Sequence, residues 1–125
     1  MSEILVGDIA LALFTALVVE DDSLQREALA DVLKREGLEV IECTTAEAAE
    51  LVLATTGLEL RALVTDIQLA GEMSGIELAE YAKQKYPALS VVVMSGRDAP
   101  ALPRDARFLQ KPFRPNELVE AIRPR

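Results

Sequence analysis

Hydrophobic positions along the chain alternate between two patterns. Short, nearly continuous apolar runs predict strands that are buried on both faces. These runs fall at residues 14–19, 38–43, 61–65, 90–95 and 107–110. Between them, apolar residues recur with helical spacing, as Leu29 and Leu33 do in the first such segment. The helical segments fall at residues 23–36, 44–55, 76–86 and 115–122. This alternation predicts an α/β fold, in which helices cover both faces of a parallel sheet.

The ends of the predicted helices carry recognisable signals. Gly37 follows the first helical segment and Pro87 follows the third, and both residue types end helices. The spacing of a capping box, Ser or Thr followed three residues later by Glu, occurs at Thr44 with Glu47 and at Ser74 with Glu77. We therefore expect these two pairs to begin the second and third helices.

The segment 96–106 does not follow this alternation of strands and helices. Only eleven residues separate the fourth strand from the fifth, and Pro100 and Pro103 lie among them. A parallel crossover needs about a dozen residues, and a proline in a helix interior costs about 3 kcal/mol. We expect the fourth crossover helix to be short, irregular or absent, and this segment to be the most mobile part of the chain.

The N-terminal stretch also stands apart. Leu5, Ile9 and Leu13 recur at a spacing that places them on one face of a helix, although a glycine within the stretch weakens a helix and a strand is also compatible. We divide the chain into an extension, residues 1–13, and a single domain, residues 14–123. The extension is either an additional element or frayed end of this domain, or a segment that binds a partner or forms a homodimer.

Composition narrows the classes of function. The chain has 125 residues, of which 50% are hydrophobic and 27% charged, as expected of one soluble globular domain. Its formal net charge is −8 without a basic stripe, which argues against direct nucleic-acid binding. No apolar run reaches the length of about 20 residues that spans a bilayer, so we expect no membrane insertion.

The absence of histidine limits the available chemistry further. Imidazole-based acid–base catalysis, Ser-His-Asp nucleophiles and imidazole metal sites are excluded. Cys43 is the single cysteine and can form neither an internal disulfide nor a thiolate-rich metal site, which is consistent with a cytoplasmic location. Carboxylates, hydroxyls and lysines remain as reactive groups.

Such groups follow the ends of four predicted strands, where open α/β sheets bind their ligands. They are Glu20, Asp21 and Asp22 after the first strand, Asp66 after the third, Ser95 with Gly96 at the fourth, and Lys111 after the fifth. Clustered carboxylates repel one another and attract a cation, and oxygen ligands alone favour Mg²⁺ or Mn²⁺. A divalent ion beside an ammonium and a hydroxyl suits a phosphoryl group. Asp66 stands alone at its strand end, and we choose it as the nucleophile that forms an aspartyl phosphate.

Four sequence segments carry a resemblance to a known family. They are VVEDD at 18–22, TDIQL at 65–69, VMSG at 93–96 and KPF at 111–113. Over about residues 14 to 123 the chain resembles the receiver domain of two-component response regulators, either as a stand-alone protein or detached from a hybrid histidine kinase. The resemblance implies a flavodoxin-like, doubly wound sheet of five parallel strands in the order 2-1-3-4-5. It also implies a phosphoacceptor of a phosphorelay rather than an enzyme.

The resemblance assigns roles around the phosphoacceptor. Asp66 would be phosphorylated by a histidine kinase or a histidine phosphotransfer protein. Asp21, Asp66 and the backbone carbonyl of Gln68 would bind Mg²⁺, with Glu20 acting through water. A downstream protein would receive the signal.

Further positions match the family's switch residues. Ser95 would be the switch hydroxyl, Lys111 the ion-pair partner of the phosphoryl group, and Phe108 the switch aromatic. Gln68 and Arg97 occupy the positions that tune dephosphorylation in the family, although both could equally be solvated loop residues. The resemblance also implies a cis peptide bond after Lys111.

The chain differs from the family pattern in several places. The loop between Asp66 and Gly75 is one residue longer than usual and lacks the usual proline, and Phe108 has no hydroxyl to donate. The fourth crossover and the last helix are short, so we do not expect this chain to use the family's usual dimer interface or output surface. Two alternatives remain open: a receiver-like module that binds proteins independently of phosphorylation, and a metal-dependent phosphohydrolase.

Overall fold

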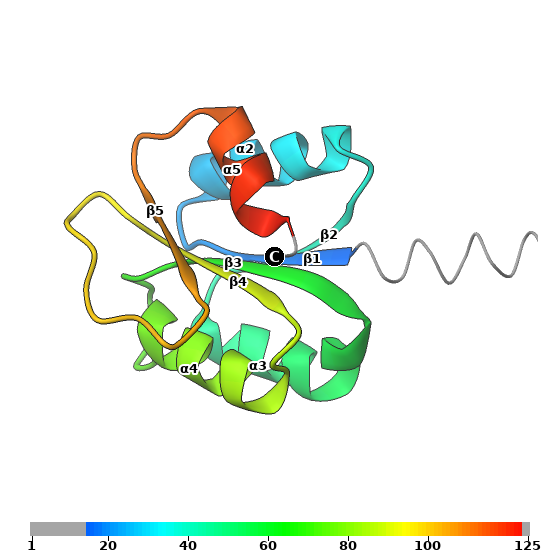
Figure 1. The fold of residues 1–125 in the computed structure, drawn as a ribbon, viewed down its shortest axis with the longest axis vertical. Coiled ribbons are helices and arrows are strands. Elements are labelled where there is room, and N and C mark those ends of the chain that lie inside the picture. The colour runs from blue at the N-terminus through cyan, green and yellow to red at the C-terminus, as the bar shows by residue number, and fades with distance from the viewer. Residues whose placement is uncertain (1–14, 124–125) are drawn as a thin grey trace, which may run out of the picture.

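The computed structural model describes residues 15–123, which form a five-stranded parallel sheet between two layers of helices (Figure 1). The strands are β1 (Thr15–Val19), β2 (Glu39–Cys43), β3 (Leu60–Asp66), β4 (Ser90–Ser95) and β5 (Arg107–Gln110). Their order in the sheet is β2-β1-β3-β4-β5, which confirms the predicted order. The expected N-terminal extension lies outside the described residues.

Helices cover both faces of the sheet, as Figure 1 shows. They are α2 (Ser23–Arg35), α3 (Ala46–Thr56), α4 (Gly75–Lys85) and α5 (Pro115–Ile122), with a short 3₁₀ turn η1 (Gly57–Glu59) before β3. Helices α2 and α5 lie on one face, and α3 and α4 lie on the other.

The two faces of β1 enter two separate hydrophobic clusters. Leu17 and Val19 pack toward α3 and α4, whereas Ala16 and Val18 pack toward α2 and α5. All four side chains are fully buried, as the continuous apolar run predicts for a central parallel strand. Packing on both faces holds the strands rigidly, so the residues at their carboxyl ends have fixed positions.

One of the two predicted capping boxes is present, and the first helix of the described chain has a side-chain cap as well. Asp22 caps α2 by accepting a hydrogen bond from the Gln25 amide at 2.9 Å. The predicted capping box at the start of α4 is present. The predicted box at the start of α3 is wrong, because that helix begins one residue later than its spacing requires. Thr45, rather than Thr44, accepts from the Ala48 amide at 3.1 Å, and Glu47 bonds elsewhere.

Gly75 allows α4 to begin against the end of β3. Its amide donates to the carbonyl oxygen of Ile67 at 2.9 Å. A Cβ at this position would overlap the carbonyl oxygen of Asp66. Only glycine permits this close approach, so the loop after Asp66 returns to the strand from which it left.

The connection between β4 and β5 contains no helix in the part of the chain that the structure describes, as the two prolines predict. Leu102 and Ala106 pack against the core cluster beneath α3 and α4, so this irregular segment covers sheet surface in place of a helix. Gly96 to Ala101 are exposed.

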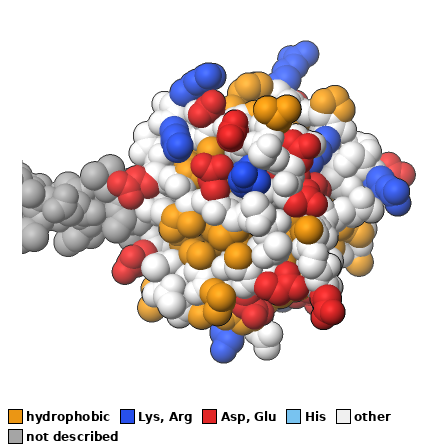
Figure 2. All heavy atoms as spheres, turned by 180° about the vertical axis from the view of Figure 1, so that it is seen from behind, with side chains coloured by type: hydrophobic (Ala, Val, Ile, Leu, Met, Phe, Trp, Pro, Cys, Tyr) orange, Lys and Arg blue, Asp and Glu red, His pale blue; other side chains and the backbone are white. Residues whose placement is uncertain are grey.

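The surface carries charges of both signs. Figure 2 shows acidic, basic and apolar side chains interspersed on one face, without a continuous basic stripe on that face. Within residues 15–123, no helix is long and apolar enough to cross a membrane.

Candidate functional site

Three acidic side chains meet at the carboxyl ends of β1 and β3. Glu20 and Asp21 follow β1, Asp66 ends β3, and one carboxylate oxygen from each lies within 4.8 Å of the others. This convergence follows from the parallel sheet, in which β1 and β3 are neighbours paired along their length. The strand ends predicted the meeting of these three residues, whereas Asp22, also named at the end of the first strand, caps α2 instead.

Glu20 is the buried member of the cluster, with 1% of its surface exposed. Its Oε1 accepts from the Asp22 amide at 3.2 Å, and its own amide donates to the carbonyl oxygen of Cys43 at 3.1 Å. Burial, together with the negative charge of Asp66, raises the pKa of Glu20, and hydrogen bonds from Lys111 and the Asp22 amide offset part of the rise. A cation close to this buried carboxylate would stabilise its ionised form.

Asp66 is partly open to solvent, with 15% of its side chain exposed. Its Oδ1 accepts from the Ile67 amide at 2.9 Å, and its Oδ2 accepts from Lys111 at 3.1 Å. These two bonds fix the orientation of the carboxylate, and the exposed part leaves it accessible to another molecule.

Lys111 connects the acidic cluster to the first helix of the described chain. Its Nζ donates to Glu20 Oε2 at 3.0 Å, to Asp66 Oδ2 at 3.1 Å and to Gln25 Oε1 at 2.7 Å. Burial alone would lower the pKa of Lys111, but hydrogen bonds to the two carboxylates and their charges outweigh it, so the pKa is raised. The expected cis peptide bond between Lys111 and Pro112 is present.

Ser95 lies at the end of β4, next to the strand that ends in Asp66. It is 7% exposed, and its hydroxyl oxygen accepts from the Arg97 amide at 3.0 Å. The Lys111 amide donates to the carbonyl oxygen of Ser95 at 2.8 Å, so the chain that follows β5 and carries the lysine is attached next to Ser95.

The side chains of three other predicted residues lie outside this hydrogen-bond network. Gln68 and Arg97 have exposed side chains, and Phe108 is half-buried in β5, where it pairs in register with Val93. Among the described residues, no hydrogen bond or ion pair of the acidic cluster involves the side chain of Gln68, Arg97 or Phe108.

The structure adds residues that sequence reasoning missed. Gln25 contacts Lys111 directly, and Arg26 donates from its Nη1 to the carbonyl oxygen of Glu20 at 2.9 Å while pairing with Glu42 at 3.3 Å. Both lie in the first turn of α2, immediately after the acidic segment. Their closeness in sequence to that segment is the signal that could have indicated them.

The residues present fit a magnesium ion. Three carboxylates and one ammonium leave a formal charge of −2 at the cluster, which one divalent cation would balance. Mg²⁺ prefers oxygen ligands and commonly uses one or two carboxylates with water molecules. The cluster of Glu20, Asp21 and Asp66 can therefore hold a metal.

This combination of fold and site defines a class of protein. The family model for the response regulator receiver domain matches residues 16–123, and the chain belongs to that family. The structure is thus a receiver domain of a two-component response regulator with a flavodoxin-like fold, as the sequence segments indicated.

Individual proteins of similar sequence are also response regulators. The response regulator receiver protein CpdR of Brucella abortus is 37% identical over 112 residues, covering 85% of this chain and 91% of that protein. The transcriptional regulatory protein FixJ of Azorhizobium caulinodans is 33% identical over 112 residues, covering 85% of this chain. The chain spans 52% of the length of FixJ and 23% of that of the response regulator protein FleR of Pseudomonas aeruginosa.

Solved structures show the same architecture. A response regulator receiver protein from Sinorhizobium medicae superimposes with a TM-score of 0.79 at 26% identity, covering 86% of this chain and 90% of that chain. The receiver domain of the hybrid histidine kinase CckA gives a TM-score of 0.75 at 26% identity, covering 86% of this chain and 94% of that chain.

Proposed function

We propose that this domain is a phosphorylation switch, in which the Asp66 carboxylate accepts a phosphoryl group from the phosphohistidine of a histidine kinase or histidine phosphotransfer protein. The arrangement of Lys111, Glu20 and Asp21 around a partly exposed Asp66 is the observation that carries this proposal. A downstream protein would read the phosphorylated state, and the domain itself would turn over no substrate.

The transfer is a substitution at phosphorus. An Asp66 oxygen forms the new P–O bond, while the P–N bond breaks and its electron pair returns to the imidazole nitrogen of the donor. Lys111 lies 3.1 Å from Asp66 Oδ2, and its ammonium can neutralise negative charge on the transferring oxygens.

We assign the metal site to Asp21, Asp66 and the backbone carbonyl of Gln68, with Glu20 acting through water. Bound Mg²⁺ would supply charge neutralisation at the phosphoryl oxygens. The convergence of carboxylate oxygens of Glu20, Asp21 and Asp66 within 4.8 Å of one another supports this assignment.

Ser95 and Lys111 are the residues that would respond to phosphorylation of Asp66. The Ser95 hydroxyl accepts a hydrogen bond from Arg97 in the structure and could instead donate to a phosphoryl group on Asp66. Such a change would release the Arg97 amide and the irregular segment that follows it. Phe108 lies on the strand that follows this segment, and we assign it a change of side-chain packing on phosphorylation. Gln68 and Arg97 would control how readily water reaches the phosphoryl group and removes it.

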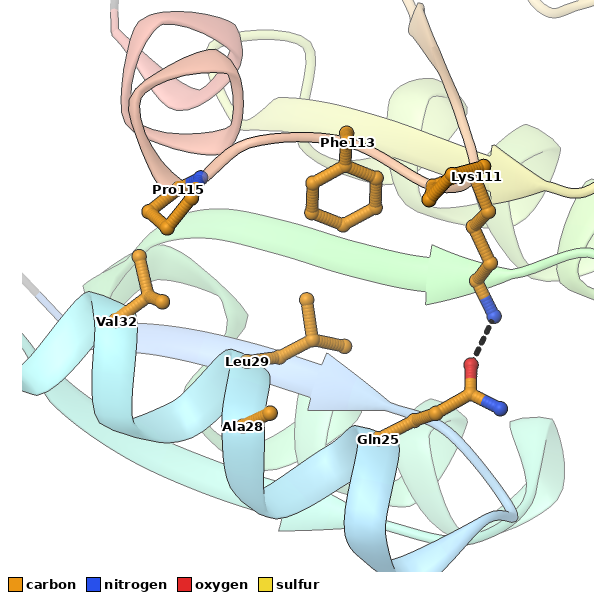
Figure 3. Close-up of a pocket in the computed structure, with 8 residues that line it drawn as sticks. Gln25, Ala28, Leu29, Val32, Lys111, Phe113 and Pro115 are labelled. Carbon is orange, nitrogen blue, oxygen red and sulfur yellow. Dashed lines mark hydrogen bonds between the residues drawn. The ribbon is translucent and has the colours of Figure 1, made fainter.

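The phosphodonor would dock on the apolar groove beside Lys111. Figure 3 shows this groove between α2 and the chain after β5, with Leu29, Phe113 and Pro115 along it and the hydrogen bond between Lys111 and Gln25 at one end. Its volume is about 510 Å³. On the first turn of α2, Leu24 has 77% of its surface exposed. A donor helix that presents a phosphohistidine beside apolar side chains would match this surface.

The proposal is tested by incubating the protein with acetyl phosphate and Mg²⁺ and measuring its intact mass. We expect the mass of one phosphoryl group to be added to wild-type protein. The addition should disappear in the Asp66→Ala variant and when a chelator removes Mg²⁺. No addition to the wild-type protein, or equal addition to the variant, would overturn the proposal.

A further inference from the structure

The loop that follows the phosphoacceptor, residues 67–74, is held by a carboxylate from a different helix. Glu47, in the first turn of α3, accepts hydrogen bonds at its Oε2 from the Glu72 amide at 3.0 Å and from the Met73 amide at 3.1 Å. These bonds join residues 25 and 26 positions apart in the sequence. They are contacts to main-chain groups, so they constrain the path of the loop rather than a single side chain.

The loop is shaped around this carboxylate. Gly71 has a φ of 95°, a conformation that residues with a side chain rarely adopt. A Cβ at that position would lie 2.8 Å from Glu47 Oε1, so a larger residue there would also displace the carboxylate. Thr45, two residues before Glu47, forms a parallel bridge with Ala70.

The carboxylate is held in its ionised form. Hydrogen bonds from its own amide and from the amides of Met73 and Glu72 lower the pKa of Glu47. Charge-assisted bonds from main-chain amides to a carboxylate are stronger than bonds between neutral groups.

The same loop forms one side of the phosphorylation site. It follows Asp66, whose Oδ1 accepts from the Ile67 amide, and it ends before Gly75, whose amide donates to the Ile67 carbonyl oxygen at 2.9 Å. Gln68, whose carbonyl we assigned to the metal, lies between these fixed points. Glu47 and Thr45 attach the remainder of the loop to α3.

We infer that Glu47 is a positioning residue, which holds the loop 67–74 in the conformation that binds the divalent cation beside Asp66. This inference rests on the proposed function, because it assumes the metal site at Asp66. Glu47 acts through main-chain hydrogen bonds to the loop. Loss of an outer partner that orients a metal ligand typically costs about 10- to 100-fold in metal affinity. Glu47 acts through several residues of backbone, so we expect the lower end, about tenfold.

The test is a calorimetric titration of the metal-free protein with Mg²⁺. We expect Glu47→Ala to bind Mg²⁺ about tenfold more weakly than wild type. Glu47→Gln retains a carbonyl oxygen that can accept both amide hydrogens, so its affinity should lie close to wild type. Glu50→Ala, three residues further along the same helix, is the matched control and should leave the affinity unchanged.

A second measurement separates positioning from general stability. Thermal unfolding without metal and amide exchange at Glu72 and Met73 are recorded for the same variants. Faster exchange at these amides in Glu47→Ala, together with weaker Mg²⁺ binding, supports the inference. Faster exchange with unchanged Mg²⁺ affinity overturns it, because Glu47 would then only stabilise the loop. Unchanged exchange also overturns it.

Failure of the proposed function gives a different result. Wild-type protein that binds no Mg²⁺ contradicts the proposed metal site and, with it, the positioning role of Glu47. Wild-type protein that binds Mg²⁺ with the same affinity as Glu47→Ala contradicts the positioning role alone.

Discussion

Removing the ammonium of Lys111 should destabilise the metal-free domain and increase its stabilisation by Mg²⁺. We choose Lys111→Met, because methionine keeps an unbranched apolar stem of similar reach while losing the charge. In the variant, the buried Glu20 and the neighbouring Asp66 lose their shared cation, and their negative charges face each other.

The magnitude follows from the geometry. Lys111 Nζ lies 3.0 Å from Glu20 Oε2 and 3.1 Å from Asp66 Oδ2. At an effective dielectric constant of about 20, each contact corresponds to about 5 kcal/mol of attraction. Desolvation of the charged groups offsets most of this attraction, and loss of one partner from a fully buried pair typically costs about 3–5 kcal/mol. Because 22% of the Lys111 side chain is exposed, we expect a smaller loss, about 2 kcal/mol.

The assay is urea unfolding of wild type and variant, each with a chelator and with saturating Mg²⁺. Without metal, the variant should have the lower free energy of unfolding. With Mg²⁺, the variant should recover most of the difference, because the divalent cation then neutralises the two carboxylates and binds the folded state more tightly. Lys85→Met, at an exposed lysine of α4, is the control and should change neither value.

Two results would refute this reasoning. Equal stability of Lys111→Met and wild type in the chelator would show that the ammonium does not compensate the buried carboxylate. An equal gain from Mg²⁺ in both proteins would show that Lys111 and the metal do not neutralise the same charge.

Four further predictions concern other parts of the domain. Ser95→Ala should lose about 1 kcal/mol of stability and still accept a phosphoryl group, but NMR shifts of the loop after β4 should no longer respond to phosphorylation; an unchanged response would exclude the hydroxyl as the switch. Gly75→Ala should lower the free energy of unfolding by about 2 kcal/mol or more, since its Cβ would overlap a main-chain carbonyl oxygen, and urea unfolding with no loss would contradict this close approach. The amide signals of Glu72 and Met73 should shift in NMR spectra only as the pH falls below the ordinary glutamate pKa of about 4.5, because a lowered pKa of Glu47 in the folded state keeps these hydrogen bonds intact above that pH. A transition at or above that pH would contradict the lowered pKa. Residues 96–106 should show the fastest amide exchange between β1 and α5, and exchange as slow as in β4 would refute this expectation.

Much of the fold could be predicted because its signals are local. The continuous apolar run that ends in Val19 and the valines of β4 identify buried parallel strands without any tertiary information. Pro100 and Pro103 exclude a regular fourth crossover helix for a reason that lies entirely in their backbone chemistry. The order of the strands came from the family resemblance, since periodicity alone does not specify which strands are neighbours.

The acidic cluster was predictable for a related reason. Glu20 and Asp21 follow β1 and Asp66 ends β3, and the carboxyl ends of parallel strands share one edge of the sheet. Lys111 joins them from the end of β5 by the same geometry.

The contacts that depend on side-chain reach between distant elements were not predictable. Glu47 was assigned to a capping box at the start of its own helix, but α3 begins at Ala46, so its carboxylate bonds the loop after Asp66 instead. Gln25 bonds Lys111 across 86 positions of sequence. Both contacts join a helix to a segment distant in sequence, and the position of a helix on the sheet is determined by packing of the whole core.

The central claim is that Asp66 itself carries the phosphoryl group. Borohydride reduction of protein treated with acetyl phosphate and Mg²⁺ converts an aspartyl phosphate to homoserine, which peptide mass spectrometry can locate. We predict homoserine at position 66 and at no other acidic residue. Homoserine at position 21, or none in wild-type protein that has gained a phosphoryl group, would contradict the account.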